Sequence, residues 1–169
     1  MLAYLFVVFA VLFRLLPHTM GFTPVVAALL FFGSRKPRRQ MWIPFLLLFG
    51  SDIFLTKVYY GYPLTPDHIV SWIFYVAVLF GASALGQAPG ALRLAGASLG
   101  SSIVFFIVSN FASWLVWYPR TVEGLATCYT LAIPFFRNAV AGDLFFTAAL
   151  FGLAALVEGY VGKRRTAEA

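Results

Sequence analysis

Residues 22–33 read FTPVVAALLFFG, an apolar run that is too short to cross a membrane as a helix. At about 1.5 Å per residue it reaches only ~18 Å, whereas the hydrocarbon layer is ~30 Å thick. We expect a short helix here, or one broken near Pro24, with its outer end buried in protein, because lipid cannot satisfy free backbone polar groups. Other segments of the chain must supply this cover.

The composition of the whole chain is that of an integral membrane protein. Its 169 residues are 62% hydrophobic, 18% aromatic and 11% charged, with a mean hydropathy of +0.89. A water-soluble domain normally carries about 25% charged residues. Since one helical crossing takes about 20 apolar residues, the length allows about six crossings in a single transmembrane domain over 1–169. There is no room for a separate soluble domain.

Six apolar segments, each bounded by Pro, Gly or charge, are the predicted crossings. They are 1–16, 22–33, 41–60, 68–86, 93–117 and 139–161. The stretch 118–138 is predicted to be an external loop with an interfacial helix, because a seventh crossing would spoil the charge pattern described next. The predicted fold is therefore an all-α bundle of six transmembrane helices, with a short second helix and an external helix between the fifth and sixth.

Basic residues outnumber acidic ones by 12 to 6 and lie at the ends of apolar runs, so they indicate membrane topology rather than nucleic-acid binding. With six crossings, eight basic residues fall on the side of both termini and four on the other side. The eight are Arg35, Lys36, Arg38, Arg39, Arg93, Lys163, Arg164 and Arg165, and the four are Arg14, Lys57, Arg120 and Arg137. This bias predicts a multi-pass protein of the cell inner (plasma) membrane with both termini cytoplasmic.

Polar side chains inside a membrane are costly, and by default they form a site or pair with one another. Counted along the helices, the deep ones lie in the middle or outer half of the bundle. The candidate substrate-binding residues are Arg14, His18, Asp52, Asn110, Trp117, Tyr129, Arg137, Asn138 and Asp143. One interpretation is an outward-facing polar pocket. The alternative is two internal ion pairs, since two arginines and two aspartates cancel.

Arg137 is the predicted central anchor of this layer, because it is expected at the start of the sixth helix, where Pro134 ends the preceding loop. Its planar guanidinium can bind a carboxylate, an amide or a phosphate. Asp143 lies six residues further on and does not form an i,i+4 pair with it. Arg137 is therefore expected to reach either Asp52 or a ligand.

No enzyme motif is present: the chain has no G-x-S-x-G, H-E-x-x-H, phosphate-binding loop or dinucleotide fingerprint. Neither His18 nor His68 has a companion at metal-ligand spacing, so no metal site and no cofactor are expected. Cys128 is interpreted as a small buried hydrophobe, with a soft ligand for a metal-containing cofactor as the alternative. No chain of acids reaches the inner face, which argues against a pump or channel acting alone.

Gly96 and Gly100 form a G-x-x-x-G motif in the fifth segment. Small residues at this spacing let two helix backbones approach closely. We expect a close helix contact within the monomer here, with a dimer face as the alternative.

Six stretches carry a resemblance to a known family. They are R-x-L-P-H-T-M-G-F-T-P-V-V-A-A-L-x-F-F-G at 14–33, S-D at 51–52, A-S-L-G-S at 97–101, S-N-F at 109–111, W-Y-P-R-T-x-x-G-L-x-x-C-Y at 117–129 and I-P-F-F-R-N-x-x-x-G-D-L at 133–144. In these stretches the chain resembles a family of uncharacterised bacterial membrane proteins. That family is similar to the substrate-binding S components of energy-coupling-factor vitamin transporters.

The resemblance implies a six-helix bundle with an outward pocket roofed by the first, third and fifth connections, and an ATP-driven coupling module as partner. The expected function is capture of a vitamin-like molecule for uptake. Many S components dock that module through A-x-x-x-A on the first helix, whereas Ala3 and Ala10 are seven apart here. The alternative function is an accessory or structural subunit of a larger membrane complex, with its 19 Phe packed against partner helices or pigments. A membrane enzyme acting on lipid or quinone is the third.

Overall fold

The computed structural model describes residues 1–17 and 19–167, without the side chains of 165–167, and this part of the chain is helical with no strand. Six α-helices are joined by short connections, a π-helical segment (η2) and two 3₁₀ turns (η1 and η3). The elements are α1 Leu2–Phe13, α2 Val25–Arg35, η1 Arg38–Gln40, α3 Trp42–Ile53, η2 Phe54–Tyr59, α4 Asp67–Ala82, η3 Ser83–Leu85, α5 Ala91–Trp117 and α6 Val122–Ala167. The predicted all-α bundle is confirmed.

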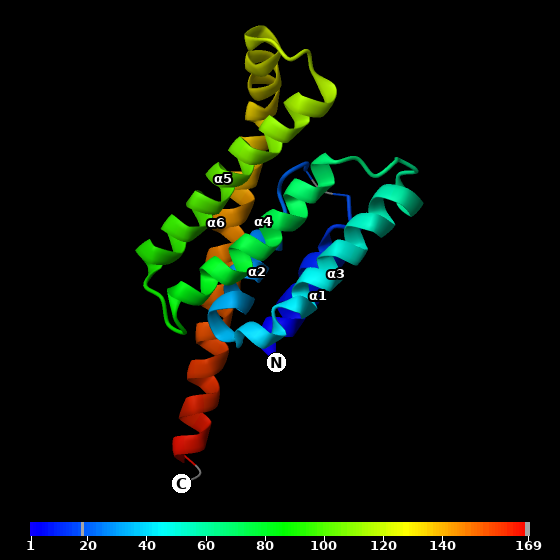
Figure 1. The fold of residues 1–169 in the computed structure, drawn as a ribbon. Coiled ribbons are helices and arrows are strands. Elements are labelled where there is room, and N and C mark those ends of the chain that lie inside the picture. Colours follow the sequence, from blue (N-terminus) through cyan, green and yellow to red (C-terminus); the bar gives the residue numbers. More distant parts are fainter. Residues whose placement is uncertain (18, 168–169) are drawn as a thin grey trace.

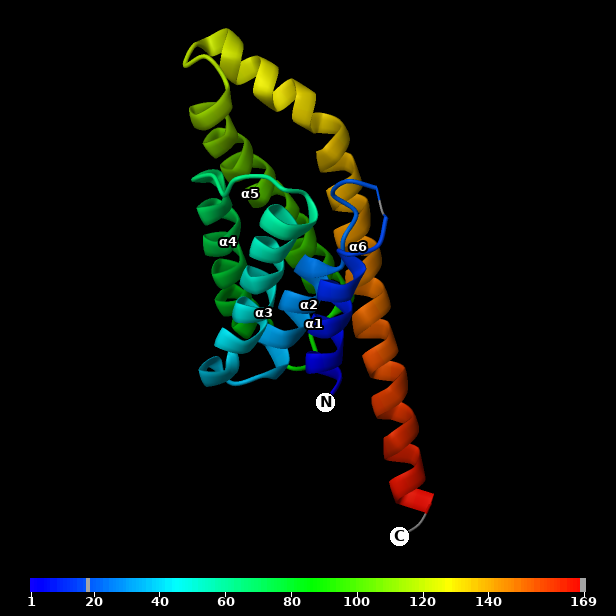
Figure 2. The same ribbon diagram turned by 90° about the vertical axis from the view of Figure 1, so that its right-hand side faces the viewer.

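The helices alternate in direction, so both ends of the chain lie at one end of the bundle (Figure 1). The connections α2–α3 and α4–α5 lie at this same end, which we call the terminal end, and the connection α3–α4 lies at the opposite end. Figure 2 shows α6 running beside the bundle and beyond it at the terminal end. Both termini and these two connections were expected on one side of the bundle from the distribution of the basic residues.

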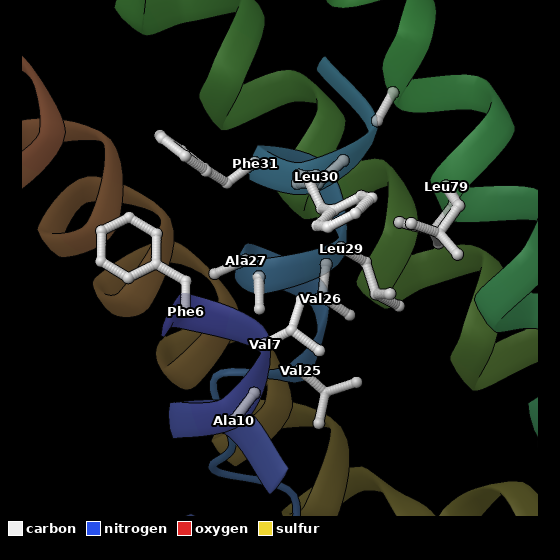
Figure 3. Packing of buried hydrophobic residues seen from close by; sticks show 14 of the residues in the cluster. Phe6, Val7, Ala10, Val25, Val26, Ala27, Leu29, Leu30, Phe31 and Leu79 are labelled. Carbon is white, nitrogen blue, oxygen red and sulfur yellow. The ribbon is translucent and has the colours of Figure 1, made fainter. Parts of the chain in front are cut away.

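The short helix α2 lies at the centre of the fold. Ten successive residues, from Val25 to Ser34, are buried. α2 packs against α1, α4, α5 and α6, and in Figure 3 Val7 of α1 and Leu79 of α4 point toward it. Because its surroundings are protein, α2 has no need to span the lipid. It begins directly after Pro24, as its sequence predicts.

Three glycines show where the backbone packs closely and where it does not. A Cβ built on Gly33 of α2 would lie 2.3 Å from the carbonyl oxygen of Leu79 in α4, so α2 and α4 touch through their backbones. By contrast, a Cβ on Gly96 or Gly100 would meet nothing within 4 Å. The expectation that this G-x-x-x-G motif makes a close helix contact within the monomer is therefore wrong. Its small residues lie on an open face of α5.

Within the described residues, four helical stretches are long and apolar enough to cross a membrane: Arg38–Tyr59, Asp67–Leu85, Ala91–Trp117 and Val122–Arg164. The chain is therefore a helical membrane protein. α1 is shorter than predicted, because it ends at Phe13, so both of the first two helices are too short to span the bilayer alone. They complete the bundle by packing against each other and against the longer helices.

The predicted external helix between the last two crossings is helical, but it is not separate from the last crossing. A single helix of 46 residues, α6, runs from Val122 to Ala167, and Pro134 lies inside it. Proline removes one backbone donor and bends a membrane helix without having to end it, and Figure 2 shows the first part of α6 inclined to the rest. Only the short connection 118–121 joins α5 to α6, and Arg137 lies within a continuous helix.

Candidate functional site

A buried ion pair lies where α1 ends and α3 passes into η2. The Nη2 of Arg14 bonds the Oδ1 of Asp52, and the two side chains are only 17% and 8% exposed. The second guanidinium nitrogen, Nη1, donates to the Ser51 hydroxyl at 2.9 Å. An internal ion pair was the alternative interpretation of the polar layer, but Asp52 was expected to meet Arg137 and is bonded to Arg14. An isolated charge at this depth would be costly, and each partner neutralises the other.

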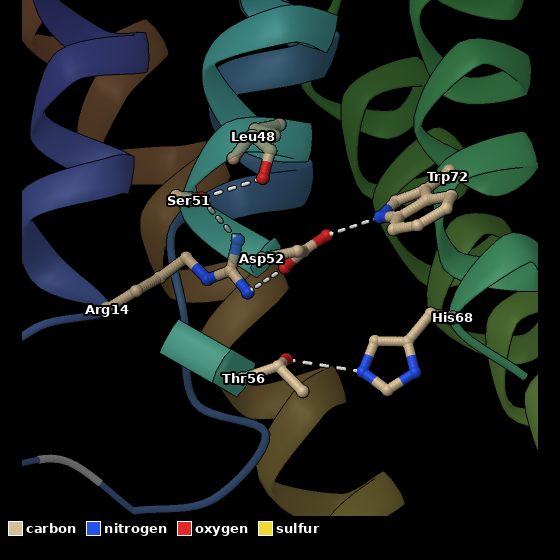
Figure 4. Close-up of polar contacts among 7 residues, drawn as sticks. All are labelled: Arg14, Leu48, Ser51, Asp52, Thr56, His68 and Trp72. Atoms are coloured by element: carbon tan, nitrogen blue, oxygen red, sulfur yellow. Dashed lines mark hydrogen bonds and ion pairs between the residues drawn. The ribbon is translucent and has the colours of Figure 1, made fainter. Parts of the chain in front are cut away.

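The indole of Trp72, on α4, fixes the other oxygen of the same carboxylate. Its Nε1 donates to Asp52 Oδ2 at 3.0 Å, so both carboxylate oxygens accept a hydrogen bond. Figure 4 shows Arg14 and Trp72 approaching Asp52 from opposite sides. Asp52 thereby joins α1, α3 and α4, and its orientation is determined from two directions.

A second set of polar contacts lies one turn further along, in η2. Thr56 lies four residues after Asp52, and its hydroxyl oxygen is 3.3 Å from His68 Nε2. The opposite ring nitrogen, Nδ1, lies 3.0 Å from the hydroxyl of Thr65, so the imidazole is held on both edges. π-Helical turns are rare and occur often at functional sites, where the widened turn redirects side chains. Here the widened turn carries Thr56.

A cavity of about 330 Å³ opens beside these groups, and we call it the Arg14–Asp52 pocket. Its volume is near the lower limit for small-molecule sites, which run from about 300 to 1,000 Å³. The lining residues come from the end of α1, the connection before α2, α3 with η2, and α4. They are Arg14, Thr23, Asp52, Leu55, Thr56, Tyr60, His68, Ser71 and Tyr75.

The contribution of α4 to this site was not predicted from the sequence. His68, Ser71, Trp72 and Tyr75 follow the i, i+3, i+4, i+7 spacing that places side chains on one face of a helix. That face points toward Asp52, where the Trp72 bond is made. Asp52 and Thr56 show the same spacing on the facing helix. Helical periodicity among polar residues was thus the signal that could have found the pocket.

Asp143, a predicted site residue, lies elsewhere, in the contact between α5 and α6. Its Oδ2 accepts a hydrogen bond from the Ser102 hydroxyl at 2.6 Å, and the residue is 4% exposed. The second predicted ion pair, which would have neutralised Asp143 with an arginine, is not formed among the described residues.

Four predicted residues lie near the turn between α5 and α6. The side-chain amide of Asn110 donates to the backbone carbonyl of Phe106 at 2.7 Å. The backbone carbonyl of Asn110 lies 3.3 Å from the sulfur of Cys128. Tyr129 donates to the Ile107 carbonyl at 2.7 Å. Asn110, Trp117 and Cys128 line a separate cavity of about 280 Å³. Cys128 is buried, in line with its interpretation as a small hydrophobe.

Arg137 does not anchor a central site. Its side chain is exposed, and Asp52, its expected partner, is bonded to Arg14 instead. The reason is that α6 continues through Pro134, so the register of a 46-residue helix, and not a loop end, sets the direction of Arg137. Its neighbour Asn138 donates to the carbonyl of Met20 at 3.2 Å. The last predicted residue, His18, lies outside the described residues.

The polar layer expected from the sequence is therefore divided into three places: the Arg14–Asp52 pocket, the buried Asp143, and the cavity near the α5–α6 turn. Within 1–17 and 19–167, no group of three His, Cys, Asp or Glu side chains is placed to hold a metal ion.

The chain belongs to a family of unknown function (DUF6580), which it matches over residues 1–166. No curated protein and no solved structure matches it.

Proposed function

We propose that the chain is a membrane subunit that binds a small, vitamin- or cofactor-like molecule in the Arg14–Asp52 pocket, for uptake into the cell. The observation that carries this proposal is the pocket itself: a cavity of about 330 Å³ whose polar side chains come from three helices and converge beside a buried ion pair. Pockets of this kind, concave and with a few placed polar groups, are the usual form of small-molecule sites.

The side chains in the pocket offer more hydrogen-bonding capacity than the ion pair needs. A guanidinium carries five N–H donors, and the bonds from Arg14 to Ser51 and Asp52 use only two nitrogens. The hydroxyls of Thr56 and Ser71 also line the cavity. An ion pair that served only to hold helices together would not require this surplus.

The charge of the pocket favours a neutral or zwitterionic ligand, because Arg14 and Asp52 cancel each other. Tyr60 and His68 contribute aromatic rings to the lining, and aromatic rings favour a planar, conjugated ligand. A heterocyclic compound with several hydrogen-bonding groups fits both properties.

Delivery requires movement of the subunit or a partner, because tightly packed apolar side chains lie between the pocket and the terminal end. Val78, Leu79 and Ala82 continue α4 below Tyr75, and all three are buried in the core. We place the pocket on the external side, since the basic residues of the terminal end predict cytoplasmic termini. An ATP-driven coupling module, as in the transporters whose S components the sequence resembles, is the partner that would supply the movement.

A second candidate function is an accessory subunit of a larger membrane complex, and one feature favours it. The turn between α5 and α6 projects beyond the ends of α3 and α4 (Figures 1 and 2). Trp117 and Val122, which flank this turn, are exposed. A projecting apolar turn of this kind could bind another membrane protein.

Mass spectrometry of small molecules that co-purify with the protein separates the two functions. We expect one compound in the native protein, its loss in the double variant Thr56→Val/Ser71→Ala, and its retention in Ser113→Ala. The last change is a matched control, because Ser113 is a half-buried serine that lines the cavity near the α5–α6 turn. A protein that carries no compound and occupies a fixed place in a multisubunit complex would instead support the accessory function.

Cysteine labelling tests the proposed orientation. In a Cys128→Ser background, an impermeant maleimide added to intact cells should label Asp67→Cys, near the external end of α4, and miss Lys36→Cys at the terminal end. Labelling of position 36 from outside would reverse the topology and place the pocket on the cytoplasmic side.

A further inference from the structure

The contact between α5 and α6 contains a buried cluster of oxygen atoms that the proposed function does not use. It is built from two facing i,i+4 pairs: Ser98 and Ser102 on α5, and Asp143 and Thr147 on α6. All four residues are buried. The Ser102 hydroxyl lies 2.6 Å from Asp143 Oδ2, and the Thr147 hydroxyl lies 3.3 Å from the Ser98 hydroxyl. We call this group the seam cluster.

The seam cluster contains one acid and no base. Asp52 is neutralised by Arg14, but among the described residues no basic side chain contacts Asp143, whose hydrogen-bond partner is the Ser102 hydroxyl. An ionised carboxylate buried without a counter-charge is strongly disfavoured inside a membrane. The neutralising charge must therefore come from outside the protein, as a proton or as a metal cation.

Cavities reach the seam cluster from two sides. Ser102 lines a cavity of about 170 Å³ that also contains Ser109 and Asn110. Thr147 lines a larger cavity of about 530 Å³ that extends toward Arg35 and Glu158 at the terminal end. The hydroxyls of the seam cluster thus lie between two openings along the same helix contact.

We propose that the seam cluster is a binding site for Na⁺. Its ligands would be the Asp143 carboxylate, the hydroxyls of Ser98, Ser102 and Thr147, and the Ser98 carbonyl. Hard cations prefer such oxygen ligands. The single carboxylate selects a monovalent ion, because Na⁺ makes the site neutral and a divalent ion would leave it charged. Five oxygen-bearing groups are more than a proton needs, since a protonated carboxyl uses one acceptor.

Ser102 can keep a hydrogen bond when Na⁺ binds, because its hydroxyl has a second acceptor. Its hydroxyl has two acceptors within reach, Asp143 Oδ2 at 2.6 Å and the Ser98 carbonyl at 3.2 Å, and its one proton serves one of them at a time. When Na⁺ neutralises Asp143, the Ser102 proton turns to the Ser98 carbonyl, and a lone pair of Ser102 faces the ion. The same hydroxyl therefore donates in the empty site and coordinates in the occupied one.

Thermal unfolding of the full-length protein in detergent tests this proposal. NaCl is titrated against choline chloride and KCl at constant ionic strength, so that screening stays fixed. A ligand that binds only the folded state raises the Tm. We expect Na⁺ at 100 times its dissociation constant to raise the Tm by about 5–10 °C, and K⁺ to have a much smaller effect.

Variants of the seam cluster make the test specific. Asp143→Asn should abolish the Na⁺ effect while the protein stays folded, because the amide is neutral and of the same shape. Ser102→Ala keeps the carboxylate and should raise the Na⁺ concentration of half-maximal stabilisation by about tenfold, the effect of one lost contact to a charge. Ser109→Ala is the matched control: its hydroxyl bonds the Phe105 carbonyl at 2.6 Å, outside the seam cluster, so the Na⁺ response should be unchanged.

Two results would overturn the proposal. Equal responses to Na⁺, K⁺ and choline in the native protein would exclude a Na⁺ site. Stabilisation by acid pH that depends on Asp143, without any Na⁺ effect, would show that a proton neutralises the carboxylate.

Discussion

Two carboxylates are buried in the described part of the membrane bundle, and their surroundings differ. Asp52 receives a guanidinium from Arg14 and an indole N–H from Trp72, so the protein supplies its counter-charge. Asp143 receives a serine hydroxyl, and no counter-charge contacts it among the residues that the structure describes. A carboxylate paired within the chain can orient a binding pocket without changing charge, whereas an unpaired one must take its partner from solution. Asp52 and Asp143 therefore have different roles, although they are the same type of residue and are similarly buried.

The largest expected effect comes from breaking the internal pair. Asp52→Ala leaves the Arg14 guanidinium buried without a partner, which should lower the free energy of unfolding by about 3–5 kcal/mol. Asp143→Asn, measured in Na⁺-free buffer, should change it by less than about 1 kcal/mol, since no buried charge loses its partner. Unfolding by SDS titration in mixed micelles measures both. Equal losses in the two variants would mean that Asp143 also has an internal counter-charge.

The second expected effect concerns backbone packing, compared between the centre around α2 and the open face of α5. Gly33→Ala places a Cβ against the Leu79 carbonyl in the packed centre around α2, so we expect a loss of about 1–3 kcal/mol from overpacking. Gly96→Ala adds the same methyl group to an open face of α5 and should stay within about 0.5 kcal/mol. SDS titration of the two variants side by side makes the comparison. A large loss from Gly96→Ala would show that this face is covered by another helix.

The smallest of the three expected losses is at Trp72. Trp72→Phe keeps a ring in place but removes the N–H that donates to Asp52 Oδ2. One hydrogen bond to a charged group contributes about 1.5–3 kcal/mol at most, and the Arg14 bond remains, so we expect a loss near the lower value. If Trp72→Phe cost as much as Asp52→Ala, the indole and not the guanidinium would be the main partner of the carboxylate.

The features of the fold that follow from lengths and costs could be predicted from the sequence. The run 22–33 is too short for a crossing, and its burial by protein follows directly from that. The pairing of two arginines with two aspartates was half right: Arg14 bonds Asp52, but Arg137 does not take part. Pairing of charges follows from energy alone, whereas choosing the partner requires the helix register.

Register and continuity could not be predicted, and the missed parts of the site follow from this. Pro134 was interpreted as the end of the loop before the sixth helix, but a membrane helix can continue through proline, and this turned Arg137 outward. The spacing is i,i+4 for Ser98 and Ser102 on α5 and for Asp143 and Thr147 on α6, but the meeting of these two pairs depends on how α5 lies against α6. The α4 face with Trp72 and Tyr75 was detectable from its spacing, because polar residues at i, i+4 and i+7 share one face.

A structure of the purified protein with its co-purified compound tests the central claim most directly. If the Arg14–Asp52 pocket is a binding site, density for a small molecule should fill it, within hydrogen-bonding distance of Arg14 and of Thr56 or Ser71, while the bond between Arg14 and Asp52 persists. Density for that compound at the turn between α5 and α6, with only water beside Asp52, would contradict the account and assign the ion pair a structural role.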